Sequence, residues 1–426
     1  MRKQIYVTGL ILILVAFCCA NGIAEKPTEE VVSLNLQEAM QRAIEHSDDI
    51  AILHAAIDVA KENKNILYDI QDPEIRVRYV EEQNDQEYQA SARFFPPNPW
   101  VISQKASAAD GEVNAVIEDS NNLEWMLSVR VMELAAEVDY LRKDLELISK
   151  LVKIFQTTLE ATRKGTVHGQ MTIQNIAPVS RLYLETIADR NKAARRYDEK
   201  NIQLSTLIGI PAKRFKINID ESNFKTDFPV SNPEIIFAKN VIFKRSDLAA
   251  RRWRVLSAEK AYKAQKAAAI PWLQHIQLSY ANNQEEATGQ TDDSEEWRIE
   301  AAFNIPLFSW WNNSSKLRFK EYQMAKTIEA SAISQCYVQF RNALDMMQST
   351  KEAKRKFMEE TGPVIENMQK ILLEAERADF LPSESARIRE QLLKTQRAKL
   401  LTEFDYLMSV INFEKTIGKR TTEFAR

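Results

Sequence analysis

The sequence predicts a mostly helical fold with a small β part, in which long antiparallel helices pack side by side as coiled coils. Glycine is rare, with 9 residues in 426 against a usual share of roughly 7%, and this favours long uninterrupted elements. Apolar residues recur at helical spacing through two stretches of about 60 residues each, roughly 90 Å of helix. The same succession of segments also occurs twice along the chain, which indicates an internal twofold repeat.

The composition is that of a folded protein with no nucleic-acid partner. Apolar residues make up 45% and charged residues 27% of the chain. The net charge of −3 and the pI near 6.0 lack the basic excess that nucleic-acid binding requires.

The N-terminus has the pattern of an export signal. Arg2 and Lys3 precede an apolar run from Ile5 to Cys19, and the small residues of Gly22-Ile23-Ala24 predict cleavage before Glu25. The alternative is a membrane anchor, but the run is shorter than the ~20 residues that span a bilayer. Cys19 is a further candidate for lipidation. A cleaved chain keeps one cysteine, Cys336, and so forms no internal disulfide.

Each half of the chain opens with a helical stretch that a proline ends. The first runs from Leu34 to about Tyr68, where Asn35 and Glu38 have capping-box spacing. The second begins at Asn232 and runs to about Ala269. Alternating residues then predict two strands per half, at 74–80, 88–95, 272–280 and 297–305, with loops at 81–87 and 281–296.

A long helix and a returning helix complete each half. The predicted pairs are 103–164 with 172–208, and 313–377 with 383–417. Gly209 and Gly418 follow the returning helices as C-caps, 209 residues apart, and Gly362-Pro363 should kink the second long helix. The predicted division is a signal peptide (1–24), a first repeat (25–211), a linker (212–231), a second repeat (232–418) and a tail (419–426).

The strands have one apolar and one polar face. They approach the ~9–11 residues of a membrane-spanning strand, and their aromatic ends suit the two interfaces. A half-buried sheet of a soluble protein would show the same alternation. If the strands lie in lipid, four are too few to close a barrel, and unpaired edges there cost several kcal/mol per backbone group. Several copies must then combine.

The residues that follow this plan resemble the outer membrane efflux protein family, the TolC family. The resemblance rests on Leu34-Asn35-Leu36-Gln37-Glu38-Ala39, on Lys244-Arg245-Ser246-Asp247-Leu248 and on Phe303-Asn304-Ile305-Pro306-Leu307-Phe308, in this order within a twofold repeat. It implies a homotrimer with a twelve-stranded transmembrane β-barrel in the outer membrane and a helical barrel in the periplasm. It also implies two partners, a periplasmic adaptor (membrane fusion protein) and an inner-membrane pump.

No residue pattern predicts an enzyme, a cofactor or a metal site. The four histidines, His46, His54, His168 and His275, lack metal-ligand spacing, and no glycine-rich phosphate loop occurs. Together with this absence of catalytic patterns, the resemblance implies a passive exit duct of a tripartite efflux or type I secretion system. The alternative is a soluble periplasmic coiled-coil scaffold or adaptor without a pore.

Two sets of residues are candidates for the channel. Polar positions of the strands are candidates for the barrel lumen, or alternatively for the extracellular mouth: Arg76, Arg78, Arg93, Arg298 and Glu300. Turns between paired helices are candidates for the periplasmic tip and aperture: Gly165, His168, Gly169, Asp379 and Phe380. Threefold symmetry would make Asp379 a ring of carboxylates that selects cations, unless it caps the last helix. The glycines and His168 would dock the adaptor, or simply form the turn.

Overall fold

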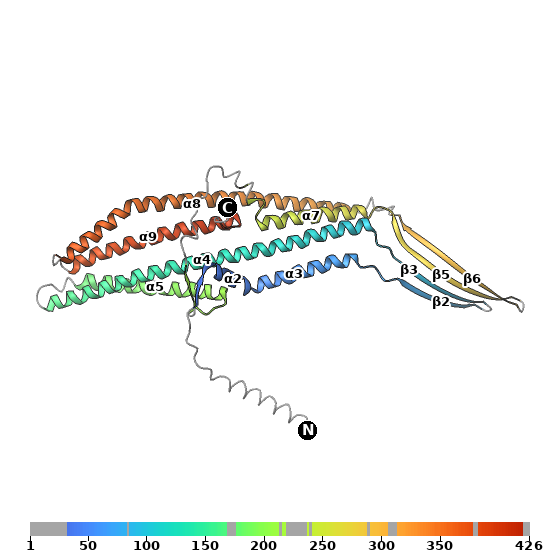
Figure 1. The fold of residues 1–426 in the computed structure, drawn as a ribbon, viewed down its shortest axis with the longest axis horizontal. Helices are drawn as coiled ribbons and strands as arrows, with labels where there is room; N and C mark the ends of the chain where they lie inside the picture. Colours follow the sequence, from blue (N-terminus) through green and yellow to red (C-terminus); the bar gives the residue numbers. More distant parts are fainter. Residues whose placement is uncertain are drawn as a thin grey trace, which may run out of the picture. The chain divides into compact units, whose positions relative to one another are not determined.

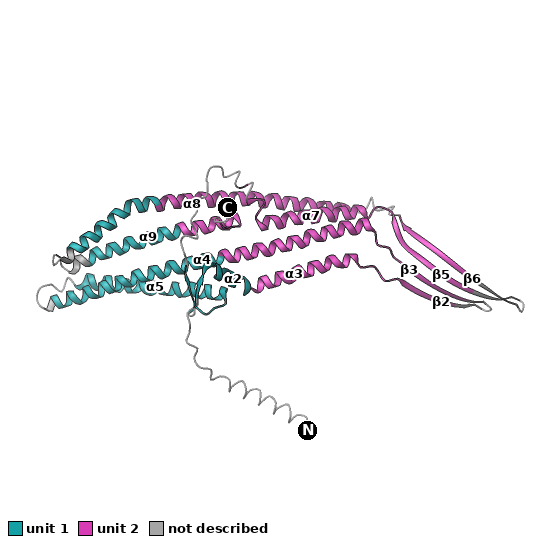
Figure 2. Ribbon diagram, viewed as in Figure 1, with its two compact units in different colours: residues 1–46, 130–223, 355–405 teal, residues 47–129, 224–354, 406–426 magenta. Residues whose placement is uncertain are grey.

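The computed structural model describes residues 32–82, 85–167, 176–212, 215–218, 237, 241–287, 290–305, 313–377 and 382–420. The chain divides into two compact units, each built from three segments (Figure 2). Unit 1 comprises Met1–His46, Arg130–Asn223 and Arg355–Asp405. Unit 2 comprises Ser47–Val129, Phe224–Lys354 and Tyr406–Arg426. Each unit therefore draws on both predicted repeats, whose boundaries remain a prediction.

The element order helix, two strands, long helix and returning helix occurs twice in the described chain (Figure 1). The first series is α3 (Asp48–Asn65), β2 (Glu74–Glu82), β3 (Asp85–Phe94), α4 (Pro99–Val167) and α5 (Ile176–Ile208). The second series is α7 (Ser246–Ala267), β5 (Trp272–Ala287), β6 (Gln290–Asn304), α8 (Asn313–Arg377) and α9 (Pro382–Ile417).

The first helical stretch is two helices rather than the single predicted one. α2 (Leu36–Glu45) begins at the expected capping box, in which Asn35 Oδ1 accepts from the Glu38 amide. Ser47 then caps α3 through its hydroxyl, and a short 3₁₀ turn, η1 (Ile66–Tyr68), follows α3. The prediction of one continuous helix was wrong because Ser47 offers the backbone a second N-cap.

The long helices agree with their predicted bounds to within a few residues. α8 begins and ends where the sequence predicts, and it continues through Pro363; the kink there stays a prediction. α4 begins four residues earlier than expected and ends at Val167. Gly165 therefore lies in the last turn of α4, not in the following turn as the sequence predicted.

The four strands form one antiparallel sheet in the order β2-β3-β5-β6. The prediction of long loops at 81–87 and 281–296 was wrong. In the first hairpin, strand pairing continues to Glu82 and Asp85, and in the second it continues to Ala287 and Gln290. Backbone hydrogen bonding extends these strands through polar residues, in which apolar and polar side chains do not alternate. A second small sheet was not predicted: β1 (Val32–Asn35) pairs in parallel with β4 (Phe215–Asn218), a strand inside the expected linker.

Unit 1 is held together where α4 contacts α5 and α9. Leu151 and Phe155 of α4 form a buried cluster with Leu393 of α9, and Leu182 and Tyr183 of α5 pack against it. The rings of Tyr140 and Phe404 stack with centroids 4.4 Å apart. The side chains of α4 recur at helical spacing, so one apolar stripe of α4 packs against both α5 and α9.

The helices of unit 2 contact one another in the order α3, α4, α7, α8. Lys64 of α3 pairs with Asp110 of α4 at 2.7 Å, and Arg254 of α7 pairs with Asp119 of α4. Between α4 and α7, Gly111 lies so close to Ser257 that an added Cβ would be 3.0 Å away. Tyr262 of α7 meets Phe319 of α8 at 5.3 Å. α3 and α8 are therefore the two edges of this order.

The returning helices end at glycines, as the sequence predicted. Gly209 and Gly418 have φ of 67° and 74°, the left-handed region that suits glycine at a helix C-terminus. His46 lies against Gly209, and Arg245 lies against Gly418. Arg245 also donates to the Thr416 carbonyl at 2.7 Å and to Cys336 Sγ at 3.1 Å. Burial raises the pKa of the Cys336 thiol, so this free cysteine is neutral at physiological pH.

Candidate functional site

The candidate site is the four-stranded sheet, whose two faces differ in chemistry. Cross-strand register places Arg76 beside Ser91, Ser91 beside Ser279, and Ser279 beside Arg298. The neighbouring row runs from Glu74 through Arg93 and Gln277 to Glu300, and the next row includes Arg78. Side chains two positions apart share a face. The structure therefore brings all five predicted lumen residues to one face: Arg76, Arg78, Arg93, Arg298 and Glu300.

The polar face is a connected network of charge and amide groups. Arg93 donates to Gln277 Oε1 at 3.0 and 2.7 Å across the β3–β5 pair, and it lies 3.6 Å from Glu74. Glu74 also accepts from Arg76 at 2.7 Å. On β6, Arg298 lies 3.0 Å from Glu296 and 3.8 Å from Glu300. The face is thus wettable and carries both signs of charge.

Sequence reasoning missed several members of this polar face. Glu74, Gln277, Ser279 and Glu296 share it with the predicted residues, and Ser279 is buried. The alternation of strand residues would have found them. Each of them lies either an even number of positions from a predicted arginine or glutamate on the same strand, or opposite such a residue on a paired strand. Selection by charge left out the neutral Gln277 and Ser279, and Glu296 was assigned to the predicted loop at 281–296.

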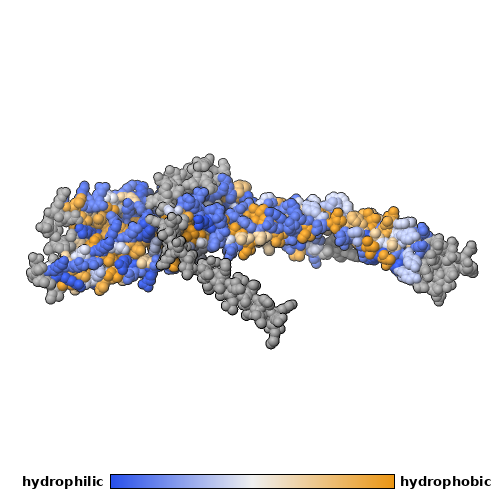
Figure 3. Space-filling model, turned by 60° about the horizontal axis from the view of Figure 1, so that its bottom comes forward, coloured by the Kyte–Doolittle hydropathy of each residue, from blue (hydrophilic) through white to orange (hydrophobic). Residues whose placement is uncertain are grey.

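The opposite face of the sheet is apolar and uncovered in the single chain. The exposed fractions are 80% for Val77, 77% for Ile299 and 74% for Ile75. Aromatic residues extend the face, with Tyr280 and Trp297 at 4.9 Å and Tyr79 and Tyr88 at 4.7 Å between ring centroids. Figure 3 shows hydrophobic side chains gathered over the sheet. A contiguous apolar face of this kind marks contact with a partner or a membrane.

The sheet also has two open edges. Within the described chain, β2 pairs only with β3, and β6 pairs only with β5. Unpaired edge strands present free N–H and C=O groups and pair readily with another strand. Both edges of the sheet can therefore pair with further strands.

Most of the predicted tip lies outside the described residues. His168, Gly169, Asp379 and Phe380 belong to this group. Gly165 is the exception, and it occupies the last turn of α4.

A buried ion pair joins the first long helix to the last helix in unit 1. Arg397 of α9 donates to both carboxylate oxygens of Asp144 on α4, at 2.6 and 3.1 Å. The hydrogen bond to Asp144 raises the pKa of Arg397. Burial, and then the charge of Asp144, raise the pKa of Tyr140 in the neighbouring turn of α4. The pair is a contact between two helices.

The described residues bring together no group of three or more His, Cys, Asp or Glu side chains that could hold a metal ion. His54 lies 3.7 Å from Glu124, and His275 packs 6.0 Å from the ring of Phe95. In the described part of the chain, no helix has both the length and the hydropathy to span a bilayer.

Comparison with known proteins gives structural matches. No protein-family model matches the chain, and no curated protein matches its sequence. The solved structure of the channel CusC aligns with a TM-score of 0.70 at 14% identity, over 93% of this chain and 96% of CusC. The CmeC outer membrane channel of Campylobacter jejuni aligns with a TM-score of 0.68 at 11% identity, over 92% of this chain and 88% of CmeC.

The outer membrane protein VceC of Vibrio cholerae aligns with a TM-score of 0.65 at 15% identity, over 90% of this chain and 96% of VceC. The chain therefore has the fold of these outer-membrane channels along nearly its whole length. This confirms the predicted fold class: mostly helical, with long packed helices, a four-stranded sheet and a twofold element order.

Proposed function

We propose that this chain, which has the fold of outer-membrane channels, is one protomer of a homotrimeric channel of the TolC family. In this proposal its strands lie in the outer membrane and its helices lie in the periplasm. The observation that carries the proposal is the sheet: one face is apolar and exposed, the other is a charged network, and both edges are open. Such a sheet separates lipid from water only when other copies complete it.

The open edges support assembly from several copies. Three copies of the four strands β2, β3, β5 and β6 make twelve, enough to close a barrel with a water-filled lumen. In the closed barrel the apolar face meets lipid, and the arginine network lines the lumen. A charged side chain on the lipid face would cost ~2–4 kcal/mol at the midplane, so the inverse arrangement is strongly disfavoured.

The edge helices of unit 2 support the same assembly. On α3 and at the start of η1, exposed Ile52, Val59 and Ile66 lie seven residues apart. On α8, exposed Leu317, Met324 and Val338 lie at multiples of seven. Apolar residues at this spacing form the seam of a coiled coil. We infer that α3 of one protomer packs beside α8 of the next, which continues the ring around the axis.

The channel acts as a passive exit duct of a tripartite efflux or type I secretion system. The sequence has no phosphate-binding loop, so energy comes from an inner-membrane pump that a periplasmic adaptor joins to the duct. Cargo then leaves through the barrel down its concentration gradient. His168 and Gly169, with Gly165 at the end of α4, are proposed to shape the tip that docks the adaptor. A photo-crosslinker at position 168 should capture a co-expressed adaptor; an active pump without such crosslinks would contradict that docking.

Membrane fractionation and conductance test the proposed function. The full-length protein should appear in the outer membrane as a trimer that dissociates on heating. It should also open ion-conducting pores in a planar bilayer. Recovery as a soluble periplasmic monomer, without conductance, would overturn the proposal and favour the periplasmic scaffold or adaptor.

A further inference from the structure

The helices of unit 2 are basic where they meet the sheet. The ten residues next to the sheet on α3 (56–65), α4 (99–108), α7 (258–267) and α8 (313–322) contain nine Lys or Arg and four Asp or Glu, a net charge of +5. The chain as a whole has a net charge of −3. Positive charge is therefore concentrated at this junction, and three of its lysines carry the argument below: Lys105, Lys263 and Lys266.

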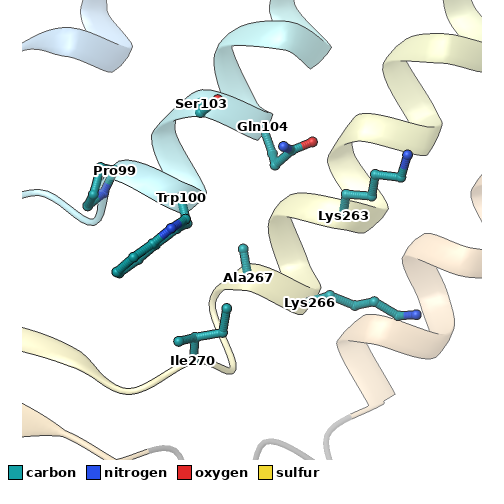
Figure 4. A pocket seen from close by; sticks show the side chains of 8 residues that line it. All are labelled: Pro99, Trp100, Ser103, Gln104, Lys263, Lys266, Ala267 and Ile270. Atoms are coloured by element: carbon teal, nitrogen blue, oxygen red, sulfur yellow. The ribbon is translucent and has the colours of Figure 1, made fainter.

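The junction also contains two hollows beside the first turns of α4. The first has a volume of about 400 Å³ and lies between α4 and the end of α7 (Figure 4). Trp100 and Ile270 line it, and their exposed fractions are 52% and 48%. The second hollow, of about 370 Å³, is lined by Pro96, Trp272 and Lys105 among others. Both hollows are open, so a flexible molecule can enter them from the surface.

Two indoles lie where the sheet meets the basic helices. Trp100 and Trp272 pack edge to face with ring centroids 5.0 Å apart. Trp272 Nε1 donates to the Pro96 carbonyl at 3.0 Å, which fixes its ring. Tryptophan favours the boundary between hydrocarbon and head groups, because it has an apolar body and one polar N–H.

Two of the three lysines extend from α7 beside the first hollow. Figure 4 shows the stems of Lys263 and Lys266 along α7 beside the first hollow, with their amines extending away from Trp100. Lys263 lies 2.6 Å from Glu259, and the amine of Lys266 lies 4.6 Å from the centre of the Tyr262 ring. Such side chains pack their methylenes on apolar surface and keep the charge in water.

We propose that this junction is a binding surface for anionic glycerophospholipid of the leaflet on the helical side. Acyl chains would lie along the apolar sheet face, the glycerol region would enter the hollows, and the phosphate would meet Lys105, Lys263 and Lys266. Charge complementarity with the three lysines, and the hollows that these lysines line together with the apolar Ile270, favour this occupant. The inference rests on the proposed insertion of the strands into the outer membrane.

Lipid retention in the assembled protein tests the inference. The variant Lys105→Gln/Lys263→Gln/Lys266→Gln is compared with Lys150→Gln/Lys153→Gln/Lys192→Gln, which removes three exposed lysines of unit 1. Each protein is placed in nanodiscs of mixed phosphatidylglycerol and phosphatidylethanolamine, and retained lipids are counted by native mass spectrometry. The junction variant should lose at least about tenfold in phosphatidylglycerol preference, whereas the control variant should match the unmodified protein.

The outcomes separate this inference from the proposed function. Conducting trimers whose lipid preference is the same in all three proteins would overturn the lipid site and leave the channel intact. Loss of the preference with 5 mM inorganic phosphate would also overturn it, because the lysines would then bind free anions. Absence of insertion by the unmodified protein would instead overturn the proposed function and the inference with it.

Discussion

At the scale of single residues, two glycines determine how the returning helices end. Gly209 and Gly418 have positive φ, and an added Cβ would lie 2.8 Å from His46 and from Arg245, respectively. Glycine reaches this conformation without the Cβ clash that other residues incur. Local sequence was sufficient to predict both caps. Their contacts with His46, which ends α2, and with Arg245, which precedes α7, required the tertiary structure.

Replacing these glycines should destabilise the protein. We expect Gly209→Ala and Gly418→Ala each to lower the free energy of unfolding by about 1–2 kcal/mol, because alanine is strained at positive φ. Gly362→Ala is the control, since its Cβ would meet nothing within 4 Å. It should stabilise α8 by about 0.5–1 kcal/mol. Guanidinium midpoints measure all three, and equal effects at the three positions would contradict the cap assignment.

At the scale of elements, the strands are distinguished by what each face can contact. Apolar and polar side chains alternate along each strand, and the register brings like residues into rows across the sheet. The alternation is visible in the sequence because it has a period of two. The hydrogen bonds from Arg93 to Gln277 were not predictable, because 184 positions separate the two residues. Only strand pairing brings them together.

A charge should be tolerated on one face of the sheet and not on the other. Val77→Lys places an amine on the apolar face, and we expect a cost of ~2–4 kcal/mol in the membrane. Less protein should then reach the outer membrane. Ala281→Lys is the matched control on the polar face, where Glu296 of the paired strand lies opposite. Fractionation with immunoblotting measures both, and equal loss for the two variants would contradict the assignment of faces.

The helices of unit 1 depend on the ion pair between Asp144 and Arg397. The Asp144 side chain is 9% exposed and that of Arg397 is 34% exposed, so solvent screens the pair only in part. We expect Arg397→Ala to cost about 1–3 kcal/mol, because it leaves a buried carboxylate without its partner. A double-mutant cycle with Asp144→Ala should give a coupling energy of at least about 1 kcal/mol.

An exposed pair provides the comparison for this cycle. Arg181 and Glu185 of α5 lie 2.7 Å apart with side chains 79% and 54% exposed. Their coupling energy should be about 0.3–0.5 kcal/mol, and it should fall with salt. Similar values for the two pairs would mean that Asp144 is more hydrated than its burial indicates.

At the scale of the whole molecule, the proposed function depends on what repeated copies create from one chain. A single copy has an uncovered apolar face, two open strand edges and exposed heptad stripes on α3 and α8. Each of these features is unfavourable in water and is satisfied by a neighbouring copy or by lipid. The proposed trimer removes all three at once. In the trimer, any residue near the threefold axis then occurs three times around that axis.

Asp379 tests this threefold arrangement at the proposed aperture. Three carboxylates close together attract cations and slow anions, so Asp379→Ala should reduce the cation preference of the pore in planar bilayers. Glu359→Ala, on the exposed surface of α8, should leave selectivity unchanged. An unaltered conductance and cation preference in Asp379→Ala would show that this residue does not line the aperture.

By itself, the sequence determined most of the helix ends, the strand ends that adjoin the helices, the twofold order of elements and the two faces of the sheet. These properties depend on neighbours within a few positions, so spacing and capping residues express them directly. The tertiary structure alone decided the β1–β4 sheet, the extension of both hairpins, the Asp144–Arg397 pair and the basic junction with its hollows. Apart from the hairpin extensions, each joins residues far apart in the chain, and local patterns carry no information about which distant partner a side chain meets.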